Sequence, residues 1–350
     1  MVLTIEDVHA AYEAILGRGP ENDDVVALHQ AQHDSSANLH AAMMASAEFD
    51  EADYIRRKKL DARTTVKIDE LDELAGAFLI GKTQLFAGKS LELPVWFDIA
   101  LPPRSAAYQA QMLLLWSAIT SRDAYSPEAD EDTPEVARQD FIKRPAFYAT
   151  EDTAIAGGHL MAIGHILTRS ELPRHGRVLE YGAGFAQTAL TFARLGAAVD
   201  TVDINPAFCR GVRKLGRHFG VDLKAYYGQF GFNPAGEDEA YDLILFYESF
   251  HHCLDADALI EKLVRMLKPN GTIILGGEPI FRTGSPDMPY DWGFRLDWEN
   301  VAIMRIRGWM ELGYNEKYLL DLFKNHGLSG EFFEDANSHW AQVYRFRASE

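Results

Sequence analysis

The fold is decided by residues 177–184, which read Arg-Val-Leu-Glu-Tyr-Gly-Ala-Gly. A short β-favouring run leads into a glycine turn, and a helical pattern begins at about Gln187. Such glycines let a ligand approach the backbone, and the helix N-terminus offers N–H groups to a carboxylate or phosphate. A second β-favouring run ends at Asp203, about 20 residues after Gly182, where a carboxylate can bind ribose hydroxyls. Together these features indicate a site for an adenosine-type ligand.

Outward from this turn, short β-favouring runs alternate with helical segments. The runs are residues 177–181, 199–203, 223–227, 241–246, 272–276, 330–334 and 342–347. Residues 316–326 have a helical pattern, and Asn205-Pro206 is a helix start signal. The alternation predicts an α/β fold with a doubly wound, mostly parallel, seven-stranded Rossmann-like sheet. Ligands are expected at the carboxyl ends of its strands.

Two cofactor classes share this geometry. A dinucleotide fingerprint needs a third small residue at position 187, where this chain has Gln187, so the NAD-dependent oxidoreductase alternative is disfavoured. The acidic Glu180 before the glycines and the run Leu-Lys-Pro-Asn-Gly at 267–271 fit another pattern. From Arg177 to the C-terminus the chain resembles class I S-adenosylmethionine-dependent methyltransferases.

This resemblance implies S-adenosylmethionine as cofactor and three contact segments. The stretch VLEYGAG places the methionine part of the cofactor over Glu180, Gly182, Ala183 and Gly184. In VDIN, Asp203 binds the ribose and Ile204 flanks the adenine. After the third strand the family often carries an Asp for the adenine amino group, whereas this chain has Gln229 followed by Phe230, so an amide hydrogen bond with ring stacking is the expectation.

The stretch DLILFYESFHHC at 242–253 resembles the family's fourth-strand motif, next to which methyl group and acceptor meet. Tyr247 is expected against the sulfonium cation, a contact worth about 0.5–2 kcal/mol. Glu248, His251 and His252 are the candidate catalytic residues because an acceptor hydroxyl needs a base. A structural role for the two histidines at the start of the next helix is equally supported. No metal is predicted, although a site built from Glu248, His252 and Glu278 is conceivable.

Acceptor contacts are expected at three further positions. Glu278 closes the fifth strand at the same sheet edge. Residues 281–314 are long for a link between elements and rich in aromatics, including Trp292, and this insertion predicts a lid or acceptor pocket. Packing on the N-terminal helices is the alternative. Tyr148 and the Gly157-Gly158-His159 turn precede the first strand, where the family commonly caps its cofactor, and burial in helix packing is the alternative for them.

The N-terminal part predicts helices throughout, with one clear helix over 105–120. Residues 12–49 loosely resemble a small helical domain of unknown function found beside bacterial glycosyltransferases and methyltransferases. We expect a helical domain over 1–60, a helical connecting region over 61–140 that ends in an exposed acidic segment, and the methyltransferase domain over 141–350.

Composition narrows the function further. With 34 Lys+Arg against 52 Asp+Glu, the net charge of −18 disfavours nucleic-acid partners. The two cysteines have no metal or redox spacing, and the sequence has neither a signal-like N-terminus nor a long apolar run, so a cytoplasmic protein without a membrane span is expected. The oligomeric state is left open.

The sequence therefore predicts an S-adenosylmethionine-dependent methyltransferase that transfers a methyl group in line, with oxygen of a small-molecule or carbohydrate acceptor as the target. A module that binds the cofactor without turnover and recruits a partner through its N-terminal helices is the alternative, ahead of the oxidoreductase.

Overall fold

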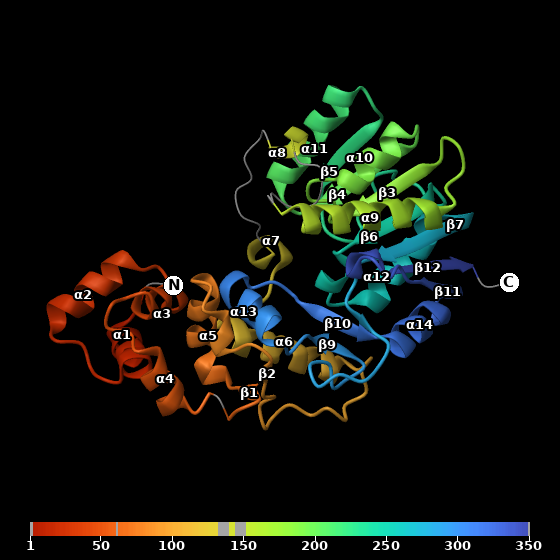
Figure 1. Cartoon of the computed structure of the whole chain (residues 1–350). Helices are drawn as coiled ribbons and strands as arrows, with labels where there is room; N and C mark the ends of the chain where they lie inside the picture. Colours follow the sequence, from red (N-terminus) through yellow and green to blue (C-terminus); the bar gives the residue numbers. More distant parts are fainter. Residues whose placement is uncertain (1–2, 61, 132–139, 144–151, 349–350) are drawn as a thin grey trace. The chain divides into compact units, whose positions relative to one another are not determined.

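The computed structural model describes residues 3–60, 62–131, 140–143 and 152–348, and the chain forms two compact units (Figure 1). Unit 1 comprises residues 1–125 and 284–311, and unit 2 comprises residues 126–283 and 312–350. The division into domains over 1–60, 61–140 and 141–350 stays a prediction.

Unit 1 is mainly helical. Its helices are α1 Ile5–Ala11, α2 Asp23–Gln32, α3 Ser36–Met44, α4 Glu51–Lys58, α5 Leu71–Leu79, α6 Ala106–Thr120 and α13 Trp298–Arg307. Three very short strands accompany them, β1 Thr65–Val66, β2 Ser90–Leu91 and β9 Trp292–Phe294. The helix predicted over 105–120 is confirmed as α6. It begins after Ser105, because the side chain of Ser105 caps the helix by accepting the backbone N–H of Tyr108.

Residues 284–311 pack on the N-terminal helices of unit 1. The hydroxyl of Tyr108 on α6 donates to the carbonyl oxygen of Trp292 at 2.5 Å, and the two rings meet edge to face. The indole nitrogen of Trp116 donates to the carbonyl oxygen of Gly308 at 2.8 Å. Arg305 on α13 forms an ion pair with Asp72 on α5. Trp292 and Trp298 of this insertion therefore pack within unit 1, as the packing alternative requires, whereas Tyr314 packs on Phe250 in unit 2.

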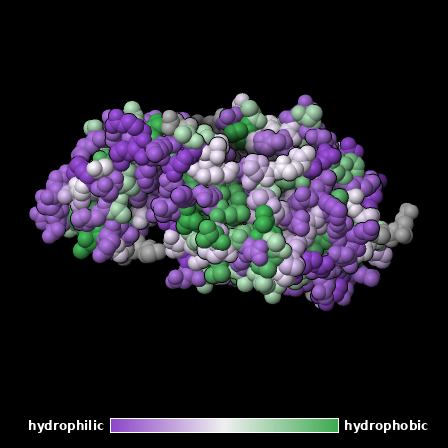
Figure 2. Space-filling view, turned by 90° about the horizontal axis from the view of Figure 1, so that it is seen from below, coloured by the Kyte–Doolittle hydropathy of each residue, from purple (hydrophilic) through white to green (hydrophobic). Residues whose placement is uncertain are grey.

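Unit 1 also exposes large apolar side chains between β2 and α6. Val95, Trp96 and Ile99 are exposed there, as is Leu114 on α6. Figure 2 shows an apolar area, in green, on the face seen from below, surrounded by mainly polar surface.

Unit 2 contains the predicted α/β sheet. Its strands are β3 Arg177–Tyr181, β4 Ala198–Asp203, β5 Leu223–Tyr227, β6 Tyr241–Tyr247, β7 Leu267–Gly276, β11 Leu328–Phe333 and β12 Val343–Ala348. The helices are α7 Pro127–Asp130, α8 Asp140–Lys143, α9 Thr153–Ser170, α10 Gln187–Arg194, α11 Pro206–Phe219, α12 Ala256–Met266 and α14 Glu316–Asn325. Outside this sheet, β8 Ile280–Phe281 pairs in parallel with β10 Leu312–Asn315.

The seven strands lie in the order β11-β12-β7-β6-β3-β4-β5. The five from β7 to β5 are parallel, and β12 and β11 run antiparallel at one edge. Strand order reverses between β3 and β6, since β4 and β5 extend to one side and β7 to the other. In doubly wound sheets the ligand binds at the carboxyl ends of the strands beside such a switch point. The seven-stranded Rossmann-like prediction is confirmed.

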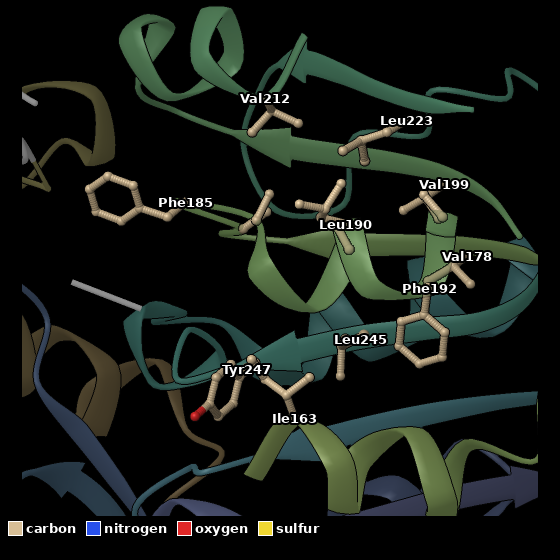
Figure 3. Packing of buried hydrophobic residues seen from close by; sticks show 14 of the residues in the cluster. Ile163, Val178, Phe185, Leu190, Phe192, Val199, Val212, Leu223, Leu245 and Tyr247 are labelled. Carbon is tan, nitrogen blue, oxygen red and sulfur yellow. The ribbon is translucent and has the colours of Figure 1, made fainter. Parts of the chain in front are cut away.

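Helices α9, α10 and α11 cover one face of the sheet, and Figure 1 shows α12 and α14 on the other side. The buried cluster on the first face includes Ile163 of α9, Leu190 of α10, Val212 of α11 and Leu245 of β6 (Figure 3). Helix α11 begins where the sequence indicates, because the side chain of Asn205 accepts the N–H of Ala207 at 2.7 Å.

Two local expectations are wrong. Strand β7 begins at Leu267 rather than at Thr272; its pairing with β6 skips from Leu267 to Thr272, so the Pro269-Asn270-Gly271 turn becomes an irregularity within the strand. In the segment expected to be an exposed acidic connection, Asp130 and Glu131 are buried. Within the described part of the chain no helix is both long and apolar enough to cross a membrane.

Candidate functional site

The glycine turn after β3 has the backbone conformation that requires glycine. Gly182 and Gly184 have φ of +63° and +50°. A Cβ atom on Gly182 would lie 2.6 Å from Cβ of Ser249, which is closer than any ordinary contact. At Gly184 the same position meets no atom of the described residues within 4 Å. The turn is therefore packed on one side and open on the other, and Ala183 between the two glycines is buried.

Glu180 lies at the base of this turn with a carboxylate that is not satisfied. Its side chain is 2% exposed, and Oε2 has no hydrogen-bond partner among the described residues. Burial raises the pKa of Glu180 to about 8, and the backbone N–H of Ala189 near the start of α10 offsets part of that rise. A buried polar atom without a partner is uncommon in folded proteins, so Glu180 is a candidate ligand contact.

Asp203 at the end of β4 is tied directly to the glycine turn. Its Oδ2 accepts the backbone N–H of Gly184 at 3.1 Å, and its Oδ1 accepts that of Asn205 at 2.7 Å. Burial raises the pKa of Asp203 to about 6. The next residue, Ile204, is half-buried. The structure thus brings together the two segments in which the sequence predicted cofactor contacts.

The loop after β5 carries Gln229 and Phe230. The ring of Phe230 lies edge-on to Tyr181 and Phe246, with ring centroids 5.9 and 5.5 Å apart. The amide nitrogen of exposed Gln229 donates to Oε1 of Glu128 on α7. This contact joins residues 101 apart in the chain, and no sequence signal pointed to Glu128.

Tyr247 ends β6 and belongs to a buried cluster. Its hydroxyl lies 2.7 Å from Nδ1 of His159 on α9, and the imidazole of His159 stacks on Trp340 with centroids 4.3 Å apart. Burial, and then the charge of His339, lower the pKa of His159 to about 4, so the ring is neutral at physiological pH. Burial raises the pKa of Tyr247. In Figure 3 the hydroxyl of Tyr247 points away from the labelled apolar side chains.

Replacing Tyr247 by phenylalanine removes this hydroxyl from His159. We expect the free energy of unfolding to fall by about 1–3 kcal/mol, because a buried ring nitrogen loses a hydrogen bond. Urea denaturation measures the change. Tyr227→Phe is the matched control, since Tyr227 is exposed, and it should change stability by less than about 0.5 kcal/mol. Equal stabilities of the two variants would contradict the assignment.

Glu248, the residue directly after Tyr247, has a backbone φ of +50°. This left-handed conformation costs energy in a residue with a side chain. Its Oε2 lies 3.8 Å from Nδ1 of His159. Across from it, a Cβ on Gly277 would lie 2.9 Å from Cγ of Glu248, so glycine is required there. Backbone strain of this kind clusters at functional sites, which supports Glu248 as a site residue.

Glu278 holds the loop after β6. Its Oε1 accepts the backbone N–H groups of Ser249 and Phe250, both at 2.8 Å, and its Oε2 accepts that of His251 at 3.1 Å. The same Oε2 lies 2.7 Å from Nδ1 of His251. Burial alone would raise the pKa of Glu278, but the charge of His251 and these hydrogen bonds outweigh it, so the pKa is lowered. With 4% exposure, the carboxylate positions the loop instead of facing an acceptor as the sequence suggested.

The two histidines have different surroundings. The side chain of His251 is 9% exposed and held by Glu278. The side chain of His252 is 22% exposed, and its Nδ1 lies 3.1 Å from Oε2 of buried Glu131. The rings are 4.3 Å apart. Glu131 is another site residue that the sequence did not indicate.

Two acceptor-site expectations do not join this cluster. Trp292 belongs to unit 1, where its indole nitrogen donates to the carbonyl oxygen of Pro103 at 2.7 Å and its ring packs on Tyr108. The side chain is 5% exposed, so the prediction of an acceptor contact is replaced by a role in the core of unit 1. Tyr148 lies outside the described residues.

Comparisons with known proteins point to one family. Residues 179–275 match the family model described as a methyltransferase domain. The ubiquinone biosynthesis O-methyltransferase of Chelativorans sp. (strain BNC1) is 32% identical over 99 residues, which are 28% of this chain and 39% of that protein. The glycine/sarcosine/dimethylglycine N-methyltransferase of Actinopolyspora halophila is 26% identical over 159 residues, 44% of this chain and 28% of that protein.

A solved structure that resembles this chain is that of 1,6-didemethyltoxoflavin-N1-methyltransferase from Burkholderia thailandensis, with bound 1,6-didemethyltoxoflavin and S-adenosylhomocysteine. It is 16% identical, with a TM-score of 0.40, and the match covers 63% of this chain and 93% of that one. The chain spans less than half the length of the curated relatives named above.

The reversal of strand order, the glycine turn and Asp203 at the end of β4 define a Rossmann-like domain for a nucleotide-type cofactor. Residues 179–275 belong to the methyltransferase domain family, and the chain carries a class I S-adenosylmethionine-dependent methyltransferase domain.

Proposed function

We propose that this chain methylates an oxygen atom of a small-molecule or carbohydrate acceptor with S-adenosylmethionine as the methyl donor. The observation that carries the proposal is Oε2 of Glu180, which is buried and has no hydrogen-bond partner within the described residues. It lies at the turn where Gly184 leaves open space for a ligand. Both features fit the methionine part of the cofactor, whose ammonium group needs an acceptor.

The residues that would hold the cofactor come from three strand ends. Glu180, Gly182, Ala183 and Gly184 follow β3, Asp203 and Ile204 follow β4, and Gln229 and Phe230 follow β5. Asp203 offers its carboxylate to the ribose hydroxyls, and Phe230 offers a ring face or edge to the adenine. Tyr247 supplies an aromatic ring near the position of the sulfonium.

When bound, the cofactor supplies an electrophilic methyl group, and its transfer to an acceptor is an in-line displacement in which positioning dominates. A hydroxyl acceptor must also lose a proton, which is the task of a general base. Among His251, His252 and Glu248, we assign that task to His252. The side chain of His252 is 22% exposed against 9% for His251, so His252 is the more accessible of the two to an acceptor.

Support for oxygen as acceptor atom comes from this base and from the O-methyltransferase relative. The N-methyltransferase relative makes nitrogen the alternative atom. A neutral amine attacks without a base, so loss of His252 would affect it far less.

Calorimetry of S-adenosylhomocysteine binding tests the proposal. We expect micromolar affinity or better, with release of about one proton near pH 7, because the raised pKa leaves Glu180 protonated before the ligand's ammonium group arrives. Comparing buffers of different ionisation enthalpy measures this release. It should vanish in Glu180→Gln and persist in Glu261→Gln, since Glu261 is exposed on α12.

Binding of NADH in place of S-adenosylhomocysteine would overturn the proposal in favour of an oxidoreductase. Binding of S-adenosylhomocysteine without turnover on any panel of phenols, sugars and small alcohols would favour the module without catalysis.

A further inference from the structure

The end of α11 and the start of β5 enclose a hollow on the surface of unit 2. The two elements lie side by side at one edge of the seven-stranded sheet (Figure 1). The hollow has a volume of about 560 Å³, which is within the range of small-molecule sites. The predicted cofactor contacts precede α11 and follow β5, so they belong to the opposite ends of the same two elements. The hollow is therefore separate from the candidate site.

Two glycines shape this hollow. Gly216 lies within α11, where glycine lowers the stability of a helix, and a Cβ atom there would lie 2.6 Å from the carbonyl oxygen of Leu223. Glycine therefore lets α11 pack directly on β5. Gly220 ends the helix with φ of +64°, and a Cβ atom there would meet no described atom within 4 Å. Both glycines line the hollow, and the space next to Gly220 is open to a ligand.

Positive charge gathers on the helix beside the hollow. Helix α11 carries Arg210, Arg213, Lys214 and Arg217 and contains no acidic residue, although the net charge of the chain is −18. Arg213 and Arg217 are one helical turn apart, so they share a face, and both are exposed and line the hollow. Lys224 lines it from β5. The hollow thus has cations on two of its walls.

A structural role accounts for only one of the two arginines. Nε of Arg213 donates to the carbonyl oxygen of Ala225 at 2.9 Å, which covers a backbone group of the edge strand. Arg217 makes no hydrogen bond, ion pair or ring contact with any of the described residues. Its guanidinium donors are therefore available to a ligand.

Asp222 is the acidic residue among the described residues that line the hollow, and it does not cancel their positive charge. Its Oδ1 lies 3.2 Å from Nζ of Lys224, and both side chains are more than half exposed. Ion pairs at such exposure contribute little to stability, so Lys224 can turn to a more highly charged anion. With Arg213 and Arg217, the lining keeps a net positive charge.

A phosphate group suits these cations better than a carboxylate. It carries nearly two negative charges at pH 7, and its oxygens accept paired N–H donors from arginine. A carboxylate carries one charge and would leave part of the positive lining without a partner. A water molecule occupies about 30 Å³ in the liquid and a phosphate group only a few times as much, so the hollow also has room for an organic body. Val221 and Tyr226 in the lining offer contacts to that body.

We propose that the hollow between α11 and β5 binds the phosphate group of a small phosphorylated molecule through Arg213, Arg217 and Lys224. This inference goes beyond the proposed function and does not rest on it, because no residue of the hollow belongs to the candidate site.

Calorimetry of the full chain with pyrophosphate tests the site, in a buffer free of phosphate and sulfate and at physiological ionic strength. Wild type should bind with a Kd below about 1 mM. Arg217→Ala should weaken binding by about tenfold or more, because the ligand loses a charge-assisted contact. Arg217→Lys should retain part of the affinity, since lysine keeps the charge and loses the paired donors.

Arg210→Ala is the matched control. Arg210 is exposed on the same helix but does not line the hollow, and its loss changes the net charge of the protein by the same amount as the loss of Arg217. Its affinity for pyrophosphate should stay within about twofold of wild type, as expected when no direct contact is removed. Equal weakening in the two variants would show a general attraction of anions to α11 and would overturn the proposal, as would an absence of binding at millimolar pyrophosphate.

Saturation with S-adenosylhomocysteine identifies where pyrophosphate binds. The affinity for pyrophosphate should be unchanged, because the hollow and the candidate site are separate. Competition between the two ligands would overturn the proposal, since pyrophosphate would then occupy the cofactor site. If S-adenosylhomocysteine does not bind at all, the proposed function fails, and the Arg217 and Arg210 variants still decide whether the hollow is a phosphate site.

Vesicles of phosphatidylcholine, with and without phosphatidylinositol phosphate, separate two carriers of the phosphate group. We expect no sedimentation with either vesicle, because the hollow is concave and suits a soluble ester. Sedimentation that requires phosphatidylinositol phosphate and is lost in Arg217→Ala, without binding of free pyrophosphate, would contradict a soluble ligand and overturn the proposal.

Discussion

Replacing His252 by alanine is expected to lower kcat for methyl transfer by about 100- to 10,000-fold, the usual contribution of a general base. The side chain of His252 is 22% exposed and lies next to Glu131, and its ring is the proposed base for the acceptor hydroxyl. S-adenosylhomocysteine should bind with unchanged affinity, because the residues proposed to hold the cofactor follow β3, β4 and β5 and the ring of Tyr247 is left in place. The measurement is turnover on whichever hydroxyl acceptor the wild type methylates.

The matched control is His218→Ala. His218 is exposed on α11, contacts the ring of Phe219 and has no part in the site, so kcat should equal that of the wild type. A His252→Ala variant that keeps kcat within a factor of about three would contradict the assignment of His252. The base would then lie elsewhere, or the acceptor would be a neutral amine, because a hydroxyl acceptor without a base could not be methylated at the wild-type rate. In that case Glu248, with its strained backbone, is the next residue to replace.

Residues close together in sequence made much of this site predictable. A strand, a glycine turn and a helix in immediate succession fix the conformation of Gly182 and Gly184, because backbone sterics allow few residues there. Alternation of strands and helices then puts Asp203 at the same edge of the sheet. The hydrogen bond from Gly184 to Asp203 follows from these local rules.

Contacts between distant segments were not predictable in this way. His159 and Tyr247 are separated by 88 positions, and Glu128 and Gln229 by 101. A lone histidine on an apolar helix or a glutamate in an acidic stretch carries no local signal of its partner. Such pairs depend on how α9 and α7 pack, and the periodicity of apolar residues in the sequence does not determine that packing.

Trp292 illustrates a different failure. The aromatic content of residues 281–314 correctly indicated apolar burial, but composition does not say which core receives the side chains. The polar atoms contribute to the outcome, since the indole nitrogen of Trp292 donates to Pro103 and the hydroxyl of Tyr108 donates to Trp292, all within unit 1.

The largest effect on stability is expected for Glu278→Gln. The carboxylate accepts three backbone N–H groups and faces Nδ1 of His251, all in a buried site. A glutamine has one acceptor oxygen, and its NH₂ group would meet N–H donors, so removal of the buried charge should lower the free energy of unfolding by about 3–5 kcal/mol. Urea denaturation at pH 7 measures it, with the exposed Glu261→Gln as control.

The same residue makes a prediction about pH. The folded protein holds the pKa of Glu278 below its ordinary value of 4.5, so the ionised form is stabilised by folding. Its contribution is fully present above pH 4.5 and is lost as the pH falls through the lower pKa of the folded state. The stability difference between wild type and Glu278→Gln should therefore shrink in acid. A difference that stays constant from neutral to acid pH would show that shape, and not the charge of Glu278, holds the loop that carries His251 and His252.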